Sequence, residues 1–156
     1  MKHILFVCTG NTCRSSMAEA MMKHLLDKEG LGSEYSVSSA GTSALDGMPA
    51  SHNAIESVAQ MGIDLRGHSS STLSSEKVSK ADLILTMTAS HKQQVLRMYP
   101  EAAGKVFTLK EYADEGRHSD VCDPFGGDLD IYMSCRDDIA GSLKQLIEKI
   151  KQKGDI

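Results

Sequence analysis

The sequence is poor in aromatic residues and contains no long apolar run. Aromatic residues make up 4% of the 156 residues and tryptophan is absent, which argues against the base-stacking surfaces of proteins that bind single-stranded nucleic acids. No apolar run approaches the ~20 residues that a membrane span requires. The apolar run Ile4–Val7 is also shorter than the core of a signal peptide, which needs about 7–15 residues. We therefore expect a cytoplasmic protein with neither a nucleic acid nor a membrane as partner.

The chain also has little net charge and few cysteines. Its formal net charge is −4, so no general attraction to DNA or to anionic lipid is expected. Hydrophobic residues make up 40% of the sequence, enough for the core of one ordinary domain, which we place at residues 1–156. A domain of this size needs no disulfide framework, and the cytosol keeps thiols reduced. Each of the four cysteines, Cys8, Cys13, Cys122 and Cys135, is therefore interpreted as either reactive or buried.

Apolar runs alternate with amphipathic patterns along the chain. The continuous apolar run at residues 3–8 is typical of a strand that is covered on both faces. Further strands are predicted at residues 35–39, 81–87 and 106–109, and helices around residues 17–26, 54–61 and 95–98. A last helix carries an apolar stripe at residues 139–150, and Asp128 and Asp130 are expected at its N-terminus. Ser16 and Glu19 form a capping-box pattern for the first helix. This alternation predicts an α/β protein, a three-layer αβα fold with a four-stranded parallel sheet, in which ligands bind beyond the carboxyl ends of the strands.

The loop after the first predicted strand carries the pattern C-x5-R-S, from Cys8 to Ser15. A short loop before a helix can direct successive backbone N–H groups toward one tetrahedral anion, and the helix N-terminus adds to this field. The same donors would stabilise the thiolate of Cys8, and Arg14 can hold two phosphoryl oxygens at once. The simpler alternative is that Cys8 is a buried strand end and Arg14 a solvated residue. The strand, the Gly-Asn turn and the following helix favour the anion site.

Four segments resemble the low-molecular-weight protein tyrosine phosphatase family: VCTGNTCRS at residues 7–15, SAGT at 39–42, GHSS at 67–70 and DPFGG at 123–127. The resemblance covers almost the whole chain and implies the flavodoxin-like αβα fold of that family, without a metal or cofactor. It implies that Cys8 is the nucleophile, that Arg14 binds phosphoryl oxygens and that Asp123 is the general acid. By the same resemblance, the phosphate and substrate site includes Thr9, Gly10, Asn11, Thr12, Cys13, Ser15 and Phe125, and Ser39 and His68 support Asn11.

Within that family the chain is most similar to the bacterial protein arginine phosphatase branch. Thr12 stands where tyrosine-specific members usually have a bulky aliphatic residue, and TLKEY at residues 108–112 and DPFGG are typical of the branch. The resemblance therefore implies phosphoarginine proteins as substrates, a phosphocysteine intermediate and a role in the stress response, with phosphotyrosine proteins as the alternative substrates. Ser16 departs from the family's usual proline. Because serine is also tolerated near a helix start, we expect only a small effect on stability.

Two other functions fit the sequence less well than hydrolysis does. A thiol-coupled arsenate reductase has a similar loop but needs two further cysteines on a mobile segment, whereas Cys122 adjoins Asp123 and Cys135 lies on the apolar stripe of the last helix. A simple phosphate-binding module needs neither Cys8 nor Asp123. The six histidines show no metal-ligand spacing, so no metal site is expected. Cys13 is predicted to be buried in the reduced protein and able to form a disulfide with an oxidised Cys8.

Overall fold

The computed structural model describes residues 1–114 and 120–156, and within them four parallel strands form a sheet in the order β2-β1-β3-β4. The strands are β1 (Lys2–Cys8), β2 (Tyr35–Gly41), β3 (Leu83–Thr86) and β4 (Val106–Thr108). The central strand β1 is buried on both sides: Ile4 and Phe6 belong to one apolar cluster, and Leu5 and Val7 to the other. Burial on both faces explains why its sequence is a continuous apolar run.

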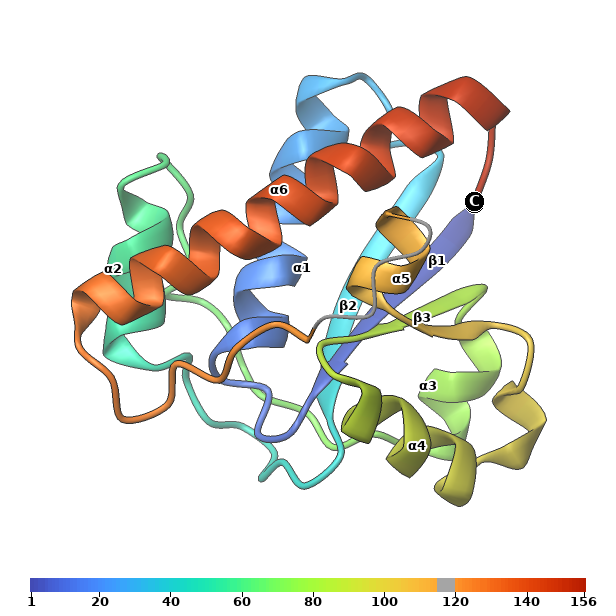
Figure 1. Cartoon of the computed structure of the whole chain (residues 1–156), viewed down its shortest axis with the longest axis horizontal. Coiled ribbons are helices and arrows are strands. Elements are labelled where there is room, and N and C mark those ends of the chain that lie inside the picture. The colour runs from blue at the N-terminus through green and yellow to red at the C-terminus, as the bar shows by residue number, and fades with distance from the viewer. Residues whose placement is uncertain (115–119) are drawn as a thin grey trace.

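Helices cover both faces of this sheet (Figure 1). On one face lie α1 (Arg14–Lys28), α2 (His52–Ala59), α5 (Leu109–Ala113) and the long α6 (Leu129–Lys153), which contacts the other three. On the other face lie α3 (Ser75–Lys80) and α4 (Ala89–Met98), followed by the 3-10 turn Pro100–Ala102. The predicted three-layer αβα architecture is confirmed.

The predicted strands are all present, but several helix boundaries differ from the prediction. The capping box is wrong: α1 begins at Arg14, the Ser16 hydroxyl donates to the carbonyl of Cys13, and Glu19 accepts a hydrogen bond from Ser39. The N–H of Met17 donates to the carbonyl of Cys13 at 3.0 Å, so Cys13 is the N-cap and the first turn begins at Arg14. The α5 helix was not predicted, and α4 begins well before the expected range, at an N-cap made by Thr88. The last helix, α6, begins where expected, with Asp128 as its N-cap and Asp130 in its first turn.

Parallel strands bring the ends of β1 and β2 to one edge of the sheet. Cys8 is the last residue of β1 and pairs with Gly41, the last residue of β2. A Cβ atom at Gly41 would lie 2.3 Å from the carbonyl oxygen of Thr9, so glycine permits the closest approach between the two segments. This contact fixes the base of the loop that follows β1. In the described part of the chain, no helix has the length and apolarity to cross a membrane.

Candidate active site

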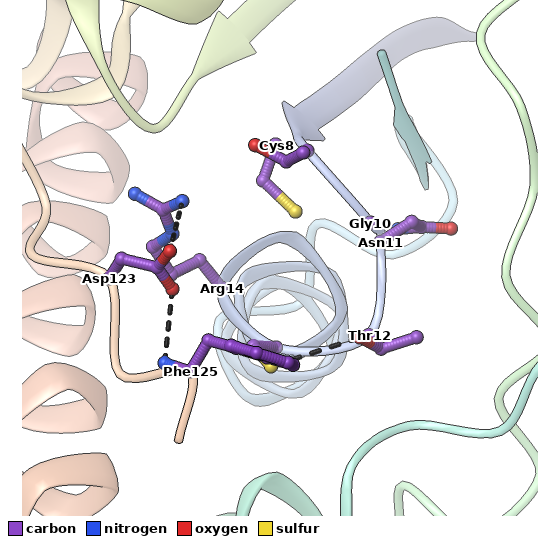
Figure 2. A pocket seen from close by; sticks show the side chains of 9 residues that line it. Cys8, Gly10, Asn11, Thr12, Arg14, Asp123 and Phe125 are labelled. Atoms are coloured by element: carbon purple, nitrogen blue, oxygen red, sulfur yellow. Dashed lines mark hydrogen bonds and ion pairs between the residues drawn. The ribbon is translucent and has the colours of Figure 1, made fainter. Parts of the chain in front are cut away.

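The loop from Thr9 to Cys13 forms the floor of a cavity of about 270 Å³. Figure 2 shows Cys8, Arg14 and Asp123 around the same opening as Thr12 and Phe125, with the loop running into the start of α1. All of the residues predicted to bind phosphate or substrate line this cavity except Ser15, which lies buried beneath it. The two distant motifs of the sequence, C-x5-R-S and DPFGG, therefore meet at one site.

The backbone of this loop directs its carbonyl groups away from the cavity. Four carbonyls accept hydrogen bonds from other segments. The carbonyls of Cys8 and Thr9 accept from the N–H groups of Thr42 (2.9 Å) and Ser43 (3.0 Å), which follow β2. The carbonyl of Asn11 accepts from His68 Nε2 (2.6 Å), and that of Thr12 accepts from the N–H of Ser51 (2.9 Å). Within residues 1–114 and 120–156, no group accepts a hydrogen bond from the backbone N–H groups of Thr9 to Cys13. A run of unpaired N–H groups at a helix N-terminus is suited to bind a tetrahedral oxyanion.

Asn11 holds the loop in shape. It has a φ of 60°, the one positive φ at a non-glycine position among the described residues, and its side chain is fully buried. Its Nδ2 donates to Ser15 Oγ and to Ser39 Oγ, both at 2.8 Å, and its Oδ1 accepts from the N–H of Ser71 at 3.0 Å. The contacts with Ser39 and His68 that the resemblance implies are therefore present, and Ser71 is an additional partner that it did not indicate.

The direction of these hydrogen bonds determines what Ser15 can offer to Cys8. Ser15 Oγ accepts from Asn11, so its own hydrogen remains available for the Cys8 sulfur, which lies 2.8 Å away. Ser39 donates its hydrogen to Glu19 (2.6 Å) and can therefore accept from Asn11. The Ser15 hydroxyl is therefore placed to donate a hydrogen bond to the sulfur of Cys8.

Arg14 and Asp123 lie together at the mouth of the cavity (Figure 2). The Arg14 guanidinium is nearly buried: its Nη1 donates to the carbonyl of Val121 at 3.0 Å, and its Nη2 lies 3.7 Å from Asp123 Oδ2. The side chain of Asp123 is 58% exposed, so this ion pair is weak and leaves the carboxyl group accessible. Its Oδ1 accepts from the N–H of Phe125 at 3.0 Å, which orients the carboxyl group over the cavity.

Comparison with protein families assigns the chain to a known family. A family model described as low molecular weight phosphotyrosine protein phosphatase matches residues 3–155. The chain belongs to this family. Members of the family are cysteine-based phosphatases, in agreement with a buried cysteine at the base of an oxyanion site.

Named members of this phosphatase family differ in the substrate that their names give. The protein-arginine-phosphatase of Bacillus subtilis is 46% identical over 149 residues, which cover 96% of this chain and 97% of the relative. A probable low molecular weight protein-tyrosine-phosphatase, EpsP of Ralstonia nicotianae, is 36% identical and covers 99% of both chains. A solved structure of the arginine phosphatase YwlE, with a phosphorylated serine in place of the active-site cysteine, matches with a TM-score of 0.91 and 46% identity over 96% of this chain and 95% of that chain.

Several residues around the loop of residues 9–13, called the phosphate loop below, were not predicted from the sequence. His91, at the start of α4, contacts Thr9 at the rim of the cavity, and burial is the main reason why the pKa of His91 is lowered to about 4. Glu19 orients Ser39, and the carbonyl of Val121 orients Arg14. Only His91 had a visible signal, since it lies three residues after Thr88 at the start of a helix, where a side chain can reach back to the cap.

Cys13 is buried beside the loop, as predicted for the reduced protein. Its thiol donates to Ser51 Oγ at 3.5 Å and lies 3.3 Å from the hydroxyl of Tyr132. Burial and the contact with Cys13 raise the pKa of Tyr132 to about 12.

In the described residues, no group of three His, Cys, Asp or Glu side chains is placed to hold a metal ion, and His118 lies outside the described residues.

Proposed function

We propose that this protein is a protein arginine phosphatase, which removes the phosphoryl group from phosphoarginine residues of proteins. The observation that carries the proposal is the cavity lined by Cys8, the loop of residues 9–13, Arg14 and Asp123. Among the described residues, the N–H groups of that loop have no acceptor. The arginine preference is supported by the 46% identity to the Bacillus subtilis protein-arginine-phosphatase over nearly the whole of both chains. It is also supported by the polar residue Thr12 in the wall of the cavity.

In the first step, the Cys8 thiolate attacks phosphorus in line with the bond to the guanidine nitrogen. The P–S bond forms and the P–N bond breaks, giving a phosphocysteine. Arg14 and the loop N–H groups hold the three equatorial oxygens as their charge develops, the type of stabilisation that contributes most in such reactions. Asp123 donates its proton to the departing nitrogen, so arginine does not leave with an unprotonated, strongly basic nitrogen.

In the second step, water attacks the phosphocysteine. The carboxylate of Asp123, now deprotonated, accepts a proton from the attacking water, and the P–S bond breaks to release phosphate. Cys8 leaves as a thiolate, which the Ser15 hydroxyl at 2.8 Å stabilises. The exposed position of Asp123 suits this double use, because its carboxyl group can reach both the leaving group and a water molecule.

The side chain at position 12 supports the choice of phosphoarginine over phosphotyrosine. Thr12 is half-buried, and its hydroxyl lies 3.8 Å from Cys13 Sγ and faces Gly10, where even an added Cβ would lie 3.7 Å away. This arrangement leaves a small polar wall that can accept a hydrogen bond from a guanidinium N–H. Aromatic side chains enclose little of the cavity, because Phe125 is 79% exposed.

A tyrosine phosphatase is the second candidate, because EpsP of Ralstonia nicotianae, which is 36% identical, is named as a probable protein-tyrosine-phosphatase.

The structure speaks against arsenate reduction as the alternative. That reaction needs two further reactive thiols, and the thiol of Cys135 is buried on α6, where it donates to the carbonyl of Cys122 at 3.5 Å. Burial raises the pKa of Cys135 to about 12, so this thiol is a poor nucleophile.

Because the mechanism requires a free thiol at Cys8, we also place the protein in the reducing cytoplasm.

A direct test compares two substrates in one assay. A phosphoarginine peptide and a phosphotyrosine peptide of the same sequence are hydrolysed by the wild-type protein, and we expect a higher kcat/KM for phosphoarginine. Cys8→Ser should abolish turnover while the protein still binds inorganic phosphate, and Cys122→Ser is the matched control with wild-type activity. A higher kcat/KM for phosphotyrosine would contradict the arginine assignment, and turnover by Cys8→Ser would contradict the covalent mechanism.

A further inference from the structure

The His91 side chain connects the second layer of helices to the rim of the active site. It is 4% exposed, and its Nε2 lies 2.8 Å from the Oγ1 of Thr9, the residue that follows the nucleophile. Its Nδ1 lies 2.9 Å from the Oγ1 of Thr88, which is the N-cap of α4. Both ring nitrogens are therefore fixed by hydroxyl groups, one of which belongs to the phosphate loop.

The hydrogen bonds of Thr88 indicate which ring nitrogen carries the hydrogen. Thr88 Oγ1 already accepts the backbone N–H of His91 at 3.1 Å, as the cap of the helix. Its own hydrogen is therefore best used by donating to Nδ1, which makes Nδ1 the acceptor and places the hydrogen on Nε2. In the opposite tautomer, the Thr88 hydroxyl hydrogen would have no partner among the described residues. The Nε2–H group then donates to Thr9 Oγ1.

The surroundings keep this imidazole neutral. Burial lowers the pKa of His91 to about 4, and the positive charge of Arg14 acts in the same direction. The carboxylates of Asp120 and Asp123 act in the opposite direction but do not overcome burial. At neutral pH, His91 therefore has one donor and one acceptor, as the chain of hydrogen bonds from Thr88 to Thr9 requires.

We propose that His91 is a positioning residue that orients the Thr9 hydroxyl so that this hydroxyl donates a hydrogen bond to the bound phosphoryl group. Thr9 lines the cavity and its carbonyl is fixed by the N–H of Ser43, so rotation of its side chain is the remaining freedom. When His91 donates to Thr9 Oγ1, the hydrogen of Thr9 must be directed elsewhere, and an anion in the cavity is the strongest acceptor nearby. This role rests on the proposed function, since it supplies one more donor to the same oxyanion site.

Matched variants test the proposal by measuring both kcat/KM for phosphoarginine and the Kd of inorganic phosphate, by calorimetry. Thr9→Val removes the hydroxyl and should weaken phosphate binding about tenfold, near the lower end for a hydrogen bond to a charged group. In His91→Asn, the asparagine amide reaches the position of Nδ1 but not that of Nε2, so it cannot donate to Thr9, and phosphate binding should weaken about tenfold as well. His91→Gln can donate near the position of Nε2 and should recover most of it. In the Thr9→Val protein, His91→Asn should cause no further loss.

Controls separate positioning from stability. Ser74→Ala removes the equivalent N-cap of α3, where Ser74 Oγ accepts from the N–H of Lys77 at 3.2 Å, and should lower stability without changing phosphate affinity. Long-range proton–nitrogen NMR spectra of the wild-type protein should show the Nε2–H tautomer of His91 at neutral pH, which needs no variant to fold.

Three results would overturn the inference: independent losses from Thr9→Val and His91→Asn, a His91→Gln protein as impaired as His91→Asn, or the Nδ1–H tautomer. A wild-type protein that neither binds phosphate nor hydrolyses phosphoarginine would instead overturn the proposed function itself.

Discussion

Removal of the Asn11 side chain should separate the two contributions of this residue to the phosphate loop. One contribution is the set of three side-chain hydrogen bonds to Ser15, Ser39 and Ser71, and the other is tolerance of the left-handed backbone at φ 60°. Asn11→Gly loses the hydrogen bonds but adopts the left-handed conformation readily, whereas Asn11→Ala loses the bonds and is also strained. The difference between the two variants therefore isolates the cost of the backbone conformation.

The structure sets the size of both effects. Each buried hydrogen bond contributes about 1 kcal/mol net, so Asn11→Gly should lower the free energy of unfolding by about 3 kcal/mol. Asn11→Ala should lower it by about 1 kcal/mol more, the cost of the left-handed conformation for a residue with a Cβ. Both variants should also lose kcat/KM by about a hundredfold or more, because loop donors that no longer converge are equivalent to lost oxyanion donors.

Urea denaturation of the two variants and of the wild-type protein measures these differences. Asn53→Ala is a suitable control, because Asn53 makes a single long hydrogen bond, 3.4 Å to the carbonyl of Gly127, and should change stability by about 0.5 kcal/mol or less. A glycine variant as stable as the wild type would show that the three bonds do not hold the loop. An alanine variant no less stable than the glycine variant would show that the left-handed backbone carries no cost.

Four further predictions follow from the same geometry. Asp123→Asn should slow hydrolysis of phosphoarginine far more than that of an activated aryl phosphate, whose leaving group needs no proton, and equal losses would remove Asp123 from the role of acid. Thr12→Ile should shift the kcat/KM ratio from phosphoarginine toward phosphotyrosine, by up to about 10⁴-fold, and an unchanged ratio would refute the role of this hydroxyl. Mild peroxide should inactivate the protein reversibly through a Cys8–Cys13 disulfide, detected by peptide mass mapping; Cys8 overoxidised beside a free Cys13 would contradict this. The free energy of unfolding should fall as pH falls from about 6.5 to 4, because the pKa of folded His91 is lowered to about 4 and only the unfolded chain binds a proton at this residue in that range. In the His91→Gln protein the free energy of unfolding should change less with pH, and an equal pH dependence in the two proteins would contradict this prediction.

Local patterns in the sequence were sufficient to predict the sheet and the phosphate loop. The strand at residues 3–8 is apolar because both faces of β1 are covered, and the loop that follows it must be compact to reach the helix at Arg14. Both features depend on neighbouring residues, so they are readable without the rest of the chain. The assignment of Ser39 and His68 depended on the family resemblance instead, because nothing local connects either of them to Asn11.

The features that were missed or misread depend on contacts between distant segments. Glu19 fits a local capping box, but in the fold it meets Ser39 of β2, and no pattern within α1 distinguishes the two roles. Similarly, the contact between His91 and Thr9 exists because β3 is next to β1, which brings the start of α4 to the phosphate loop. The orientation of Arg14 depends on a backbone carbonyl, that of Val121, which no side-chain pattern can indicate.

The outward carbonyls of the phosphate loop have a consequence for the folding of the protein. Their partners, Thr42, Ser43, Ser51 and His68, come from the segment between β2 and α3, so the oxyanion site exists only when that segment has docked. A bound anion therefore selects conformations in which both segments are folded, and phosphate in excess of its Kd shifts the whole equilibrium toward the native state. The same linkage places local opening of residues 42–51 in direct competition with ligand binding. Protection of this segment from proteolysis or hydrogen exchange should therefore rise with phosphate concentration, although none of its side chains needs to touch the anion.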